Sequence, residues 1–403
     1  PAEAGGAPLV PMAGFGGRRF ALPLAGGVEA VLLHGKLRSA SAEEPVARLL
    51  LSGPVEAVVE TIRALATALP LRPPRCSLAE QARALAQGNG SQGGGPGDAP
   101  RPRRLGAPRL QPGMAVEEAL RLLLGHLVEV LLWHETIAES GEHPVGVHQM
   151  RVALRRLRSA LKAFRRAADG PDLRHFDQGL KALARTLGPA RDWDVFLSGL
   201  GAELAEALPG EPRIAALLQA GARHREAAYA ALRQLLASPE HRLLLWDAVA
   251  LDALRPWQDE AEEAAEARRA ATLEALAALL LSKAWRRLTR VGEEIAHLPD
   301  AEFHALRLDG KRLRYLAELF APLFPRKRTR RFLERLAEMQ EQFGLANDAS
   351  VARALVESEA QGPGAWAAGV AEGWVLARSR RARARAEKAW ATMLATEAFW
   401  NQG

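Results

Sequence analysis

The sequence predicts a mainly all-α protein made of two pseudo-twofold-related helical bundles, with a small α+β domain ahead of them. Three observations support this prediction. From residue 114 onward, apolar residues recur at three- and four-residue spacing, which is typical of amphipathic helices. Two distant parts of that region match each other at one fixed offset. A run rich in Gly, Pro and Ser separates the helical region from an earlier part with strand-like patterns.

These observations divide the chain into three parts. We expect an α+β domain over residues 1–86, a flexible linker over 87–113 and a helical domain over 114–403, whose repeat units cover about 114–260 and 261–403. In the first part, residues 28–37 and 46–51 are predicted strands, and residues 55–69 are a predicted helix with one apolar face. The linker carries too few apolar residues to become ordered by burial.

After the linker every segment is predicted to be helical. Glycine and proline mark the expected breaks, at 170–171, 188–189, 209–210, 299, 322 and 362–363. The predicted helices cover residues 114–140, 147–168, 173–187, 192–208, 214–237, 248–297, 303–320 and 331–343, followed by a long C-terminal helical stretch.

The internal repeat is the strongest feature of the sequence. Residues between 148 and 195 match residues 156 positions later without a gap, which chance does not explain. The matching pairs include His148 with His304, Arg151 with Arg307, Arg155 with Lys311, Arg156 with Arg312, Arg158 with Arg314, Phe164 with Phe320, Gly188 with Gly344 and Asp192 with Asp348.

Each copy opens with the pattern His-x-x-Arg-x-x-x-(Arg/Lys)-Arg-Leu-Arg, which on a helix places cationic and apolar residues on opposite faces. The first stripe consists of His148, Arg151, Arg155, Arg158, Lys162, Arg165 and Arg166. The second stripe consists of His304, Arg307, Lys311 and Arg314, with Tyr315 beside it.

The charge pattern of these stripes favours a phosphate-bearing ligand. No acidic residue within 151–166 compensates the repulsion between neighbouring cations, whereas an ordinary solvated helix face usually alternates signs. Arginine predominates over lysine, and a guanidinium group binds paired phosphate oxygens bidentately. Two matched stripes are therefore better explained by an anionic ligand than by a plain charged surface.

The repeated histidines and aspartates have structural alternatives. We interpret His148 and His304 as hydrogen-bond partners of phosphate oxygens, with a purely structural role as the alternative. Metal binding is disfavoured because the neighbours one and two turns on are arginines, which repel cations. For Asp192 and Asp348 we prefer a helix N-cap or a buried ion pair over catalysis, and as carboxylates they could hold the orientation of the arginines.

Composition sets the wider limits. The chain has 403 residues, is 48% hydrophobic and 25% charged, and carries a formal charge of +7, which favours polyanionic partners. No apolar stretch is long enough to span a bilayer and no secretory signal is visible, so we expect a cytoplasmic protein without a membrane partner. The lone Cys76 excludes an internal disulfide. Further basic clusters at 283–290, 326–331 and 378–388 are each as compatible with plain surface as with ligand binding.

The two motif segments, VHQMRVALRRLRSALKAF and FHALRLDGKRLRYLAELF, with LGPARDWDVFL and FGLANDASVARAL after them, resemble the CHAD family, the conserved-histidine α-helical domain. The resemblance covers roughly residue 114 to the C-terminus. It implies a helical domain with internal twofold symmetry whose basic surface binds inorganic polyphosphate without catalysis or cofactor. The family pattern carries over to His148, Arg151, Arg155, Arg156 and Arg158 in the first copy, and to His304, Arg307, Lys311, Arg312, Arg314 and Tyr315 in the second.

The N-terminal domain resembles a degenerate or partial CYTH domain, the triphosphate-tunnel fold. The order of strand, strand, helix and basic segment in VEAVLLHGKL, PVARLLLSG and ALPLRPPRCSLAEQARAL carries this resemblance. The Glu-x-Glu-x-Lys strand of that family is absent, and Ala47, Leu49 and Leu51 stand where metal-binding carboxylates would alternate. We therefore expect no catalytic residues, no metal site and no enzymatic activity.

Three functions from different classes stay open at this point. The first is a module that binds inorganic polyphosphate and associates with polyphosphate granules. The second is a CYTH-type triphosphatase, against which the lost carboxylates argue. The third is nonspecific binding of nucleic acid, a weaker activity, since the stripes offer only Tyr315 for base stacking.

Overall fold

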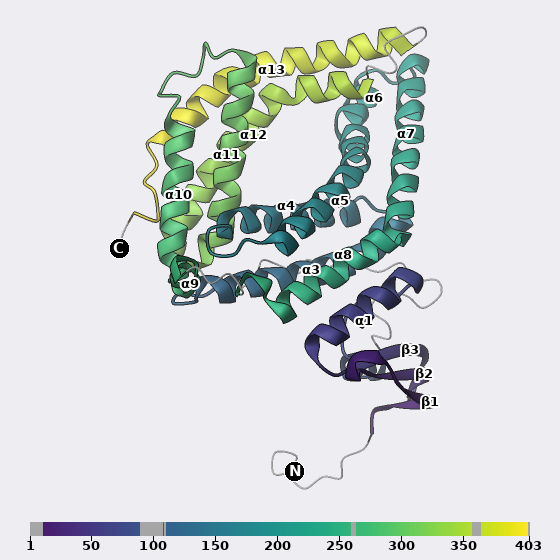
Figure 1. The fold of residues 1–403 in the computed structure, drawn as a ribbon. Coiled ribbons are helices and arrows are strands. Elements are labelled where there is room, and N and C mark those ends of the chain that lie inside the picture. The colour runs from purple at the N-terminus through teal and green to yellow at the C-terminus, as the bar shows by residue number, and fades with distance from the viewer. Residues whose placement is uncertain (1–10, 89–107, 109, 259–262, 357–363, 402–403) are drawn as a thin grey trace. The chain divides into compact units, whose positions relative to one another are not determined.

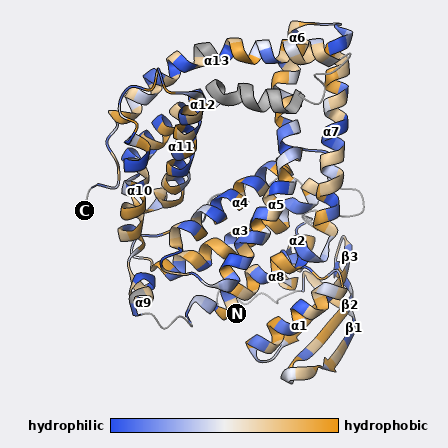
Figure 2. Ribbon diagram, turned by 45° about the horizontal axis from the view of Figure 1, so that its top comes forward, coloured by the Kyte–Doolittle hydropathy of each residue, from blue (hydrophilic) through white to orange (hydrophobic). Residues whose placement is uncertain are grey.

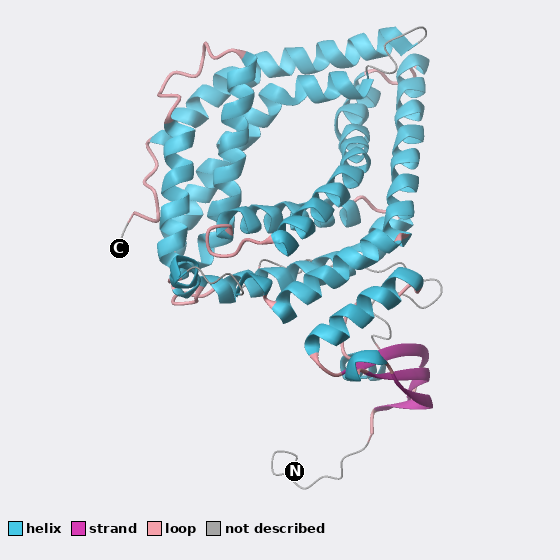
Figure 3. Cartoon of the chain, viewed as in Figure 1, coloured by secondary structure: helices cyan, strands magenta, loops and turns pink. Residues whose placement is uncertain are grey.

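The computed structural model of the chain describes residues 11–88, 108, 110–258, 263–356 and 364–401 (Figure 1). Within these ranges the side chains of residues 264, 300, 345–356 and 379–381 are not described. Helices dominate the described chain, and one small antiparallel sheet lies near its beginning (Figure 3). The prediction of a mainly all-α protein with a small α+β part at the N-terminal end is confirmed.

Close contacts group the chain into two compact units. Unit 1 comprises residues 1–104, 128–150 and 234–255, and unit 2 comprises residues 105–127, 151–233 and 256–403. Helices α3, α4 and α7 contribute residues to both units. The linker predicted over 87–113 lies largely outside the described residues.

The sheet of unit 1 has three antiparallel strands in the order β1-β2-β3. Strands β2 (Glu29–Ser39) and β3 (Glu43–Ser52) match the two predicted strands, whereas β1 (Ala13–Pro23) was not predicted. Its four residues Gly-Phe-Gly-Gly interrupt the apolar alternation by which a strand is recognised. Paired with β2 over its whole length, β1 forms nonetheless, because the ladder supplies backbone hydrogen bonds that the local sequence does not announce.

Two helices pack around this sheet. Helix α2 (Leu78–Ala86) starts at a capping box formed by Ser77 and Glu80, and its Leu85 joins Leu37 and Val46 in a small core. Helix α1 (Val55–Ala68), predicted from its apolar face, packs against α8 (Pro239–Leu254). The sheet thus has a helix on one face.

The helices after the linker repeat with the same offset as the sequence. Shifting α3 (Val116–Ser140), α4 (Val145–Phe164), α5 (Pro171–Phe196) and α7 (Pro212–Ala237) by 156 residues gives 272–296, 301–320, 327–352 and 368–393. The observed counterparts are α10 (Leu273–Thr289), α11 (Asp300–Phe320), α12 (Arg326–Val356) and α13 (Ala365–Leu394). The repeat therefore reaches beyond the motif to four consecutive long helices.

One predicted break is wrong. Helix α5 runs through Gly188 and Pro189, joining the predicted helices 173–187 and 192–208 up to Phe196, where a π-helical turn (Leu197–Gly201) and α6 (Ala202–Ala207) follow. Proline removes one helical hydrogen bond and costs about 3 kcal/mol in a helix interior. Burial of Leu187, Ala190 and Trp193 on one face of α5 offsets that cost.

Two further helix boundaries differ from the prediction. The predicted helix 248–297 is interrupted, because α8 ends where Arg255 adopts a left-handed conformation ahead of Pro256. Two short helices, Pro256–Gln258 and α9 (Glu263–Ala270), then lead to α10. Helix α4 ends at Phe164, so Arg165 and Arg166, which we placed on the first stripe, lie in the turn that follows it.

Aromatic rings fill the interior of unit 2. Phe164 of α4 and Phe320 of α11, which are repeat equivalents, meet edge to face with ring centroids 6.3 Å apart. Phe332, Phe399 and Trp400 form a second cluster with centroid distances of 4.9–5.3 Å. Such edge-to-face contacts add to the free energy gained by area burial alone.

Candidate functional site

Helix α4 separates cationic and apolar residues as its sequence predicts. Met150, Leu154, Leu157 and Phe164 are buried, and Leu161 is half-buried. The cationic residues of the helix are half-buried or exposed, namely His148, Arg151, Arg155, Arg156, Arg158 and Lys162. The alternation of hydrophilic and hydrophobic residues along this helix is visible in Figure 2. One helix therefore provides both a core face and a cationic face.

The structure brings the two stripes into contact at one point. The guanidinium carbon of Arg155, from the first stripe, lies 4.2 Å from the ring centroid of Tyr315, beside the second. A cation over an aromatic face is attracted by the ring quadrupole, which fixes the orientation of the guanidinium. Arg155 is exposed, so its charge faces solvent while the ring supports it. Residues of both copies thus belong to one surface.

Arg151 is held against the backbone of α5. Its Nη1 donates to the carbonyl of Gly188 at 3.0 Å and lies 3.6 Å from the Asp192 carboxylate. A Cβ atom at position 188 would lie 3.6 Å from this nitrogen, so the glycine keeps the approach open. Burial lowers the pKa of the Arg151 guanidinium, and Asp192 acts in the opposite direction. The group keeps its charge, since arginine does not deprotonate in proteins.

Several cations of the stripes are paired with acidic residues, contrary to the expectation of uncompensated charge. Arg158 binds Asp177 at 2.7 Å, and Arg165 binds Asp169 at 3.1 Å. In the second copy Arg314 binds Glu318 at 2.7 Å, and Arg312 binds Asp309 at 2.5 Å. The two acids of the second copy could have been found from their i+4 and i−3 spacing on one helix. Asp177 and Asp169 follow α4 in the chain and required the fold.

Four cations of the first copy have no ion pair with a described acidic residue: Arg155, Arg156, Lys162 and Arg166. Arg155, Lys162 and Arg166 are exposed, and Arg156 is half-buried. Helix α5 adds the exposed Lys181 and Arg185, which the sequence analysis did not single out. The excess of positive charge on this part of unit 2 therefore survives the pairing.

In the second copy, His304 is exposed and Arg307 is half-buried. The Nε atom of Arg307 is buried and has no hydrogen-bond partner among the described residues. Its repeat equivalent, Arg151, lies against Gly188 and Asp192, whose counterparts are Gly344 and Asp348. The side chain of Asp348 lies outside the described residues, so its predicted role remains a prediction.

Asp192 neither caps a helix nor is buried. It lies inside α5 with 48% of its side chain exposed, next to Arg151. The buried carboxylate of this segment is Asp194, two residues later, which accepts hydrogen bonds from Arg225 at 2.7 Å and from Tyr229 at 2.9 Å. The proximity of Asp194 and its burial raise the pKa of Tyr229. No feature of the sequence distinguished Asp194 from Asp192.

The additional basic clusters have mixed surroundings. Arg287 binds Asp309 at 2.9 Å, and Arg330 lies 3.6 Å from Glu334. Arg378 forms an ion pair with Glu203. Side chains 379–381 of the last cluster lie outside the described residues. At least one cation in each cluster is therefore engaged by an acidic neighbour.

Neither a metal centre nor a membrane span is found in the part of the chain that the structure describes. No three or more His, Cys, Asp or Glu side chains there come close enough together to bind an ion. No described helix combines the length and the hydropathy needed to cross a bilayer.

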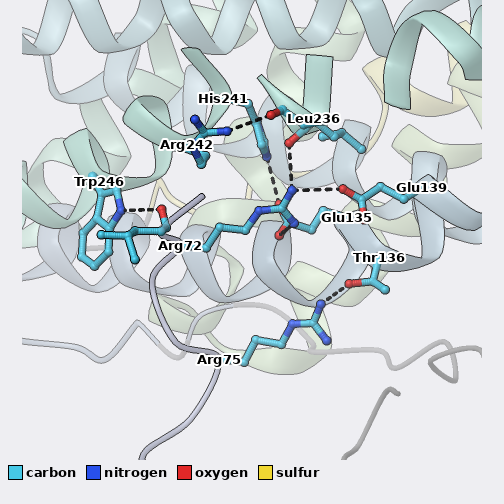
Figure 4. Close-up of polar contacts among 11 residues, drawn as sticks. Arg72, Arg75, Glu135, Thr136, Glu139, Leu236, His241, Arg242 and Trp246 are labelled. Carbon is cyan, nitrogen blue, oxygen red and sulfur yellow. Dashed lines mark hydrogen bonds and ion pairs between the residues drawn. The ribbon is translucent and has the colours of Figure 1, made fainter. Parts of the chain in front are cut away.

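A buried polar network in unit 1 was missed by the sequence analysis (Figure 4). Arg72, between α1 and α2, donates to Glu135 at 3.0 Å, to Glu139 at 3.2 Å and to the carbonyl of Leu236 at 3.0 Å. The second carboxylate oxygen of Glu135 lies 2.9 Å from Nε2 of His241. The side chains of Glu135 and His241 are only 2% and 1% exposed. Nothing in their spacing along the chain indicated this cluster.

Two neighbouring contacts secure the same connection between α1 and α2 against α8. Trp246 donates its indole hydrogen to the carbonyl of Leu71 at 3.0 Å, and Arg242 donates to the carbonyl of Ala66 at 3.0 Å. Arg75 also donates to the hydroxyl of Thr136. The N-terminal sheet and helices are thereby tied to helical segments of the same unit.

Comparison with known proteins supplies the wider context for this site. A family model described as the CHAD domain matches residues 119–357. The crystal structure of the CHAD domain from the plant Ricinus communis superposes with a TM-score of 0.62 at 28% identity, covering 74% of this chain and 98% of that one. PptA from Streptomyces chartreusis has a TM-score of 0.52 at 21% identity, covering 69% of this chain and 99% of that one, and shows likeness of fold alone. No curated protein matches the chain at a significant level.

Proposed function

The chain belongs to the CHAD family, and on this basis we propose that it binds inorganic polyphosphate on the surface shared by α4 and α11. The observation that carries the proposal is the contact between Arg155 and Tyr315, which joins the stripes of the two copies. Arg155, Lys162 and Arg166 add exposed charge that no described acidic residue neutralises. An extended polyanion matches a surface of this kind because its charges repeat along its length.

The mechanism is electrostatic. Exposed guanidinium and ammonium groups take the place of the counterions of the phosphate chain, and the released ions favour binding. Guanidinium groups also donate paired hydrogen bonds to phosphate oxygens. His148 and His304 stand at the first turns of α4 and α11, where a further hydrogen bond to the anion is available.

The cations divide into two classes by their surroundings. Arg151 and Arg158 are already bonded to α5, so they support the surface as much as they face it. Arg155, Lys162 and Arg166 are the groups on which the ligand depends most. Asp192, beside Arg151, keeps that arginine in place.

The proposal includes binding without catalysis, in the cytoplasm and at polyphosphate granules. The N-terminal part is taken as a degenerate or partial CYTH-like domain over 1–86 that serves no triphosphatase reaction. Its strand β3 carries Ala47, Leu49 and Leu51 on one face, where a metal-dependent triphosphatase needs carboxylates. Nucleic acid, a polyanion as well, is the alternative ligand, and Tyr315 gives it a single stacking partner in the stripes.

The test is a titration by calorimetry with long-chain polyphosphate, tripolyphosphate and single-stranded DNA of matched charge, at two salt concentrations. The variant is Arg155→Gln/Lys162→Gln, which removes two exposed charges without touching the bonds of Arg151 to α5. The control is Arg18→Gln/Arg19→Gln, which removes the same charge from strand β1.

We expect length-dependent binding of polyphosphate that weakens steeply with salt, is lost in the α4 variant and is retained in the β1 variant. A salt slope near zero would contradict counterion release. Equal losses in both variants would reduce the effect to net charge. Tighter binding of DNA than of polyphosphate would replace the proposed ligand.

A further inference from the structure

Exposed apolar side chains gather on the N-terminal sheet. Phe20 and Leu22 of β1 are 45% and 55% exposed, and Leu32 of β2 is 38% exposed. The pairing register places Phe20 opposite Leu32 and Leu32 opposite Leu49, so these side chains share one face of the sheet. Hydrophobic colouring along the strands in Figure 2 follows the same pattern. Contiguous exposed apolar surface of this kind marks an interaction site.

The two edges of the sheet differ in their protection. Strand β3 carries Pro45, which has no amide hydrogen, and the charged Glu43 and Glu44, all of which discourage pairing with another strand. Strand β1 is eleven residues long, has no acidic residue, and contains no proline before its last residue, Pro23. No described strand pairs with its outer edge. The unprotected edge and the exposed apolar residues thus coincide on β1.

The sequence of β1 is complementary to itself when two copies run antiparallel. With Phe20 opposite Phe20 of the partner subunit, Arg18 lies opposite Leu22 and Arg19 lies opposite Ala21, so no arginine faces another arginine. The aliphatic stem of Arg18 can then cover Leu22 while its charged end stays in water. The central phenylalanine pair continues the row formed by Leu49, Leu32 and Phe20 in each copy.

We propose that two copies of this chain associate through their β1 strands, antiparallel and centred on Phe20, into one continuous six-stranded sheet. The association buries Phe20 and Leu22, and it satisfies the backbone groups along the outer edge of β1. Its occupant is a second copy, because the one strand whose complementarity to β1 can be checked residue by residue is β1 itself. A strand-to-strand contact buries less surface than a standard interface, so the dimer dissociates on dilution.

The mass of the protein in solution is the first test. Sedimentation of the full chain should show a mass that rises from one chain toward two with concentration, and Phe20→Glu should keep it at one chain. Leu279→Glu is the matched control, since Leu279 on α10 is 56% exposed and lies outside the sheet. A wild-type protein that stays monomeric, or a dimer that Phe20→Glu leaves intact, would overturn the proposal.

Oxidative cross-linking tests the register in a Cys76→Ser background. In the proposed pairing, position 20 faces itself within disulfide distance, whereas the two copies of position 22 are separated by roughly 13 Å along the strands. Phe20→Cys should therefore cross-link to itself and Leu22→Cys should not, but a mixture of Arg18→Cys and Leu22→Cys chains should cross-link. Equal cross-linking of all three would refute the register.

Two other occupants of the same face are outcomes of the same series. A monomer that sediments with vesicles of anionic phospholipid only when Phe20 is present would assign the face to a membrane surface. A monomer that gains mass only with an added β-strand peptide would assign it to a different protein. Either result excludes the self-paired dimer.

Discussion

Replacing Arg72 with methionine tests how far unit 1 depends on a buried ion pair. Glu135 is almost completely buried, and Arg72 and His241 each contact one of its carboxylate oxygens. Methionine keeps much of the length and apolar bulk of the arginine but supplies no hydrogen bond. The carboxylate then remains in the interior without its guanidinium partner, while Glu139 and the carbonyl of Leu236 lose a donor as well.

The magnitude follows from the surroundings of the pair. Removing one partner of a buried ion pair typically costs 3–5 kcal/mol, because an uncompensated charge stays buried. We take the lower end, about 3 kcal/mol, since the Arg72 side chain is 31% exposed and His241 still contacts Glu135. At 1.4 kcal/mol per factor of ten, the opening equilibrium of unit 1 should increase roughly 100-fold.

Hydrogen exchange measured by mass spectrometry resolves this effect within one unit of a large chain. Amides of α8 and of the second half of α3 should exchange roughly 100-fold faster in Arg72→Met, while amides of α12 should not change. Arg75→Met is the control, because Arg75 bonds a threonine hydroxyl and leaves no carboxylate unpaired. A surface change of that kind stays within about 0.5 kcal/mol. Adding Glu135→Gln to Arg72→Met should restore most of the protection.

The reasoning is refuted if Arg72→Met behaves like Arg75→Met, since the buried carboxylate would then need no cation. It is also refuted if Glu135→Gln brings no recovery, because the loss would then come from packing and not from charge.

Three further predictions concern unit 2. The Asp169 carboxylate, whose pKa is lowered to about 2 mainly by a hydrogen bond from a neighbouring arginine, contributes stability above its ordinary pKa that is lost as pH falls from about 4 toward 2; Asp169→Asn should therefore destabilise the protein at pH 7 and make little difference at pH 2, measured by urea denaturation. A Cβ atom at Gly310 would lie 2.1 Å from Nε2 of the buried Gln340, so Gly310→Ala should cost about 1–3 kcal/mol, measured as a lower thermal midpoint. Loss of the ring under Arg155 in Tyr315→Leu should weaken polyphosphate binding about twofold to fivefold, whereas Tyr315→Phe should bind like the wild type.

Each of these predictions has an outcome that contradicts it. A constant effect of Asp169→Asn between pH 7 and pH 2 would mean that its ionisation is not linked to folding. For the glycine, Gly369→Ala on α13 is the control, because a Cβ atom there meets nothing within 4 Å and should be harmless. Equal affinities of the leucine and phenylalanine variants at position 315 would remove the ring from the binding surface.

Much of the helical architecture could be predicted because it rests on periodicity. The apolar spacing of α4 and α11 fixed which faces are buried, as Leu157 and its equivalent Leu313 illustrate. The 156-residue offset extended the prediction to helices with no motif of their own. Boundaries were less accessible, since Pro189 ends a helix by local rules and is nevertheless accommodated in α5 by the burial of its neighbours.

The parts that could not be predicted depend on contacts between residues far apart in the chain. Asp177 neutralises Arg158 from the next helix, and Asp194 is buried while Asp192 is not. The strand β1 pairs through its backbone, which its glycine-rich sequence conceals. Local patterns carry the preferences of single elements, whereas these features arise only when elements are packed together.

The contact of Arg155 with Tyr315 also bears on how a duplicated chain changes during evolution. A fresh duplication leaves both copies with the same residues, yet position 159 of the first copy, the counterpart of Tyr315, is serine. The guanidinium of one half therefore rests on a ring that the other half alone provides. A recombinant gene that joined two first halves would keep both arginine-rich helices and lose the ring. From that step on the halves are inherited as complementary partners and can no longer be exchanged for one another.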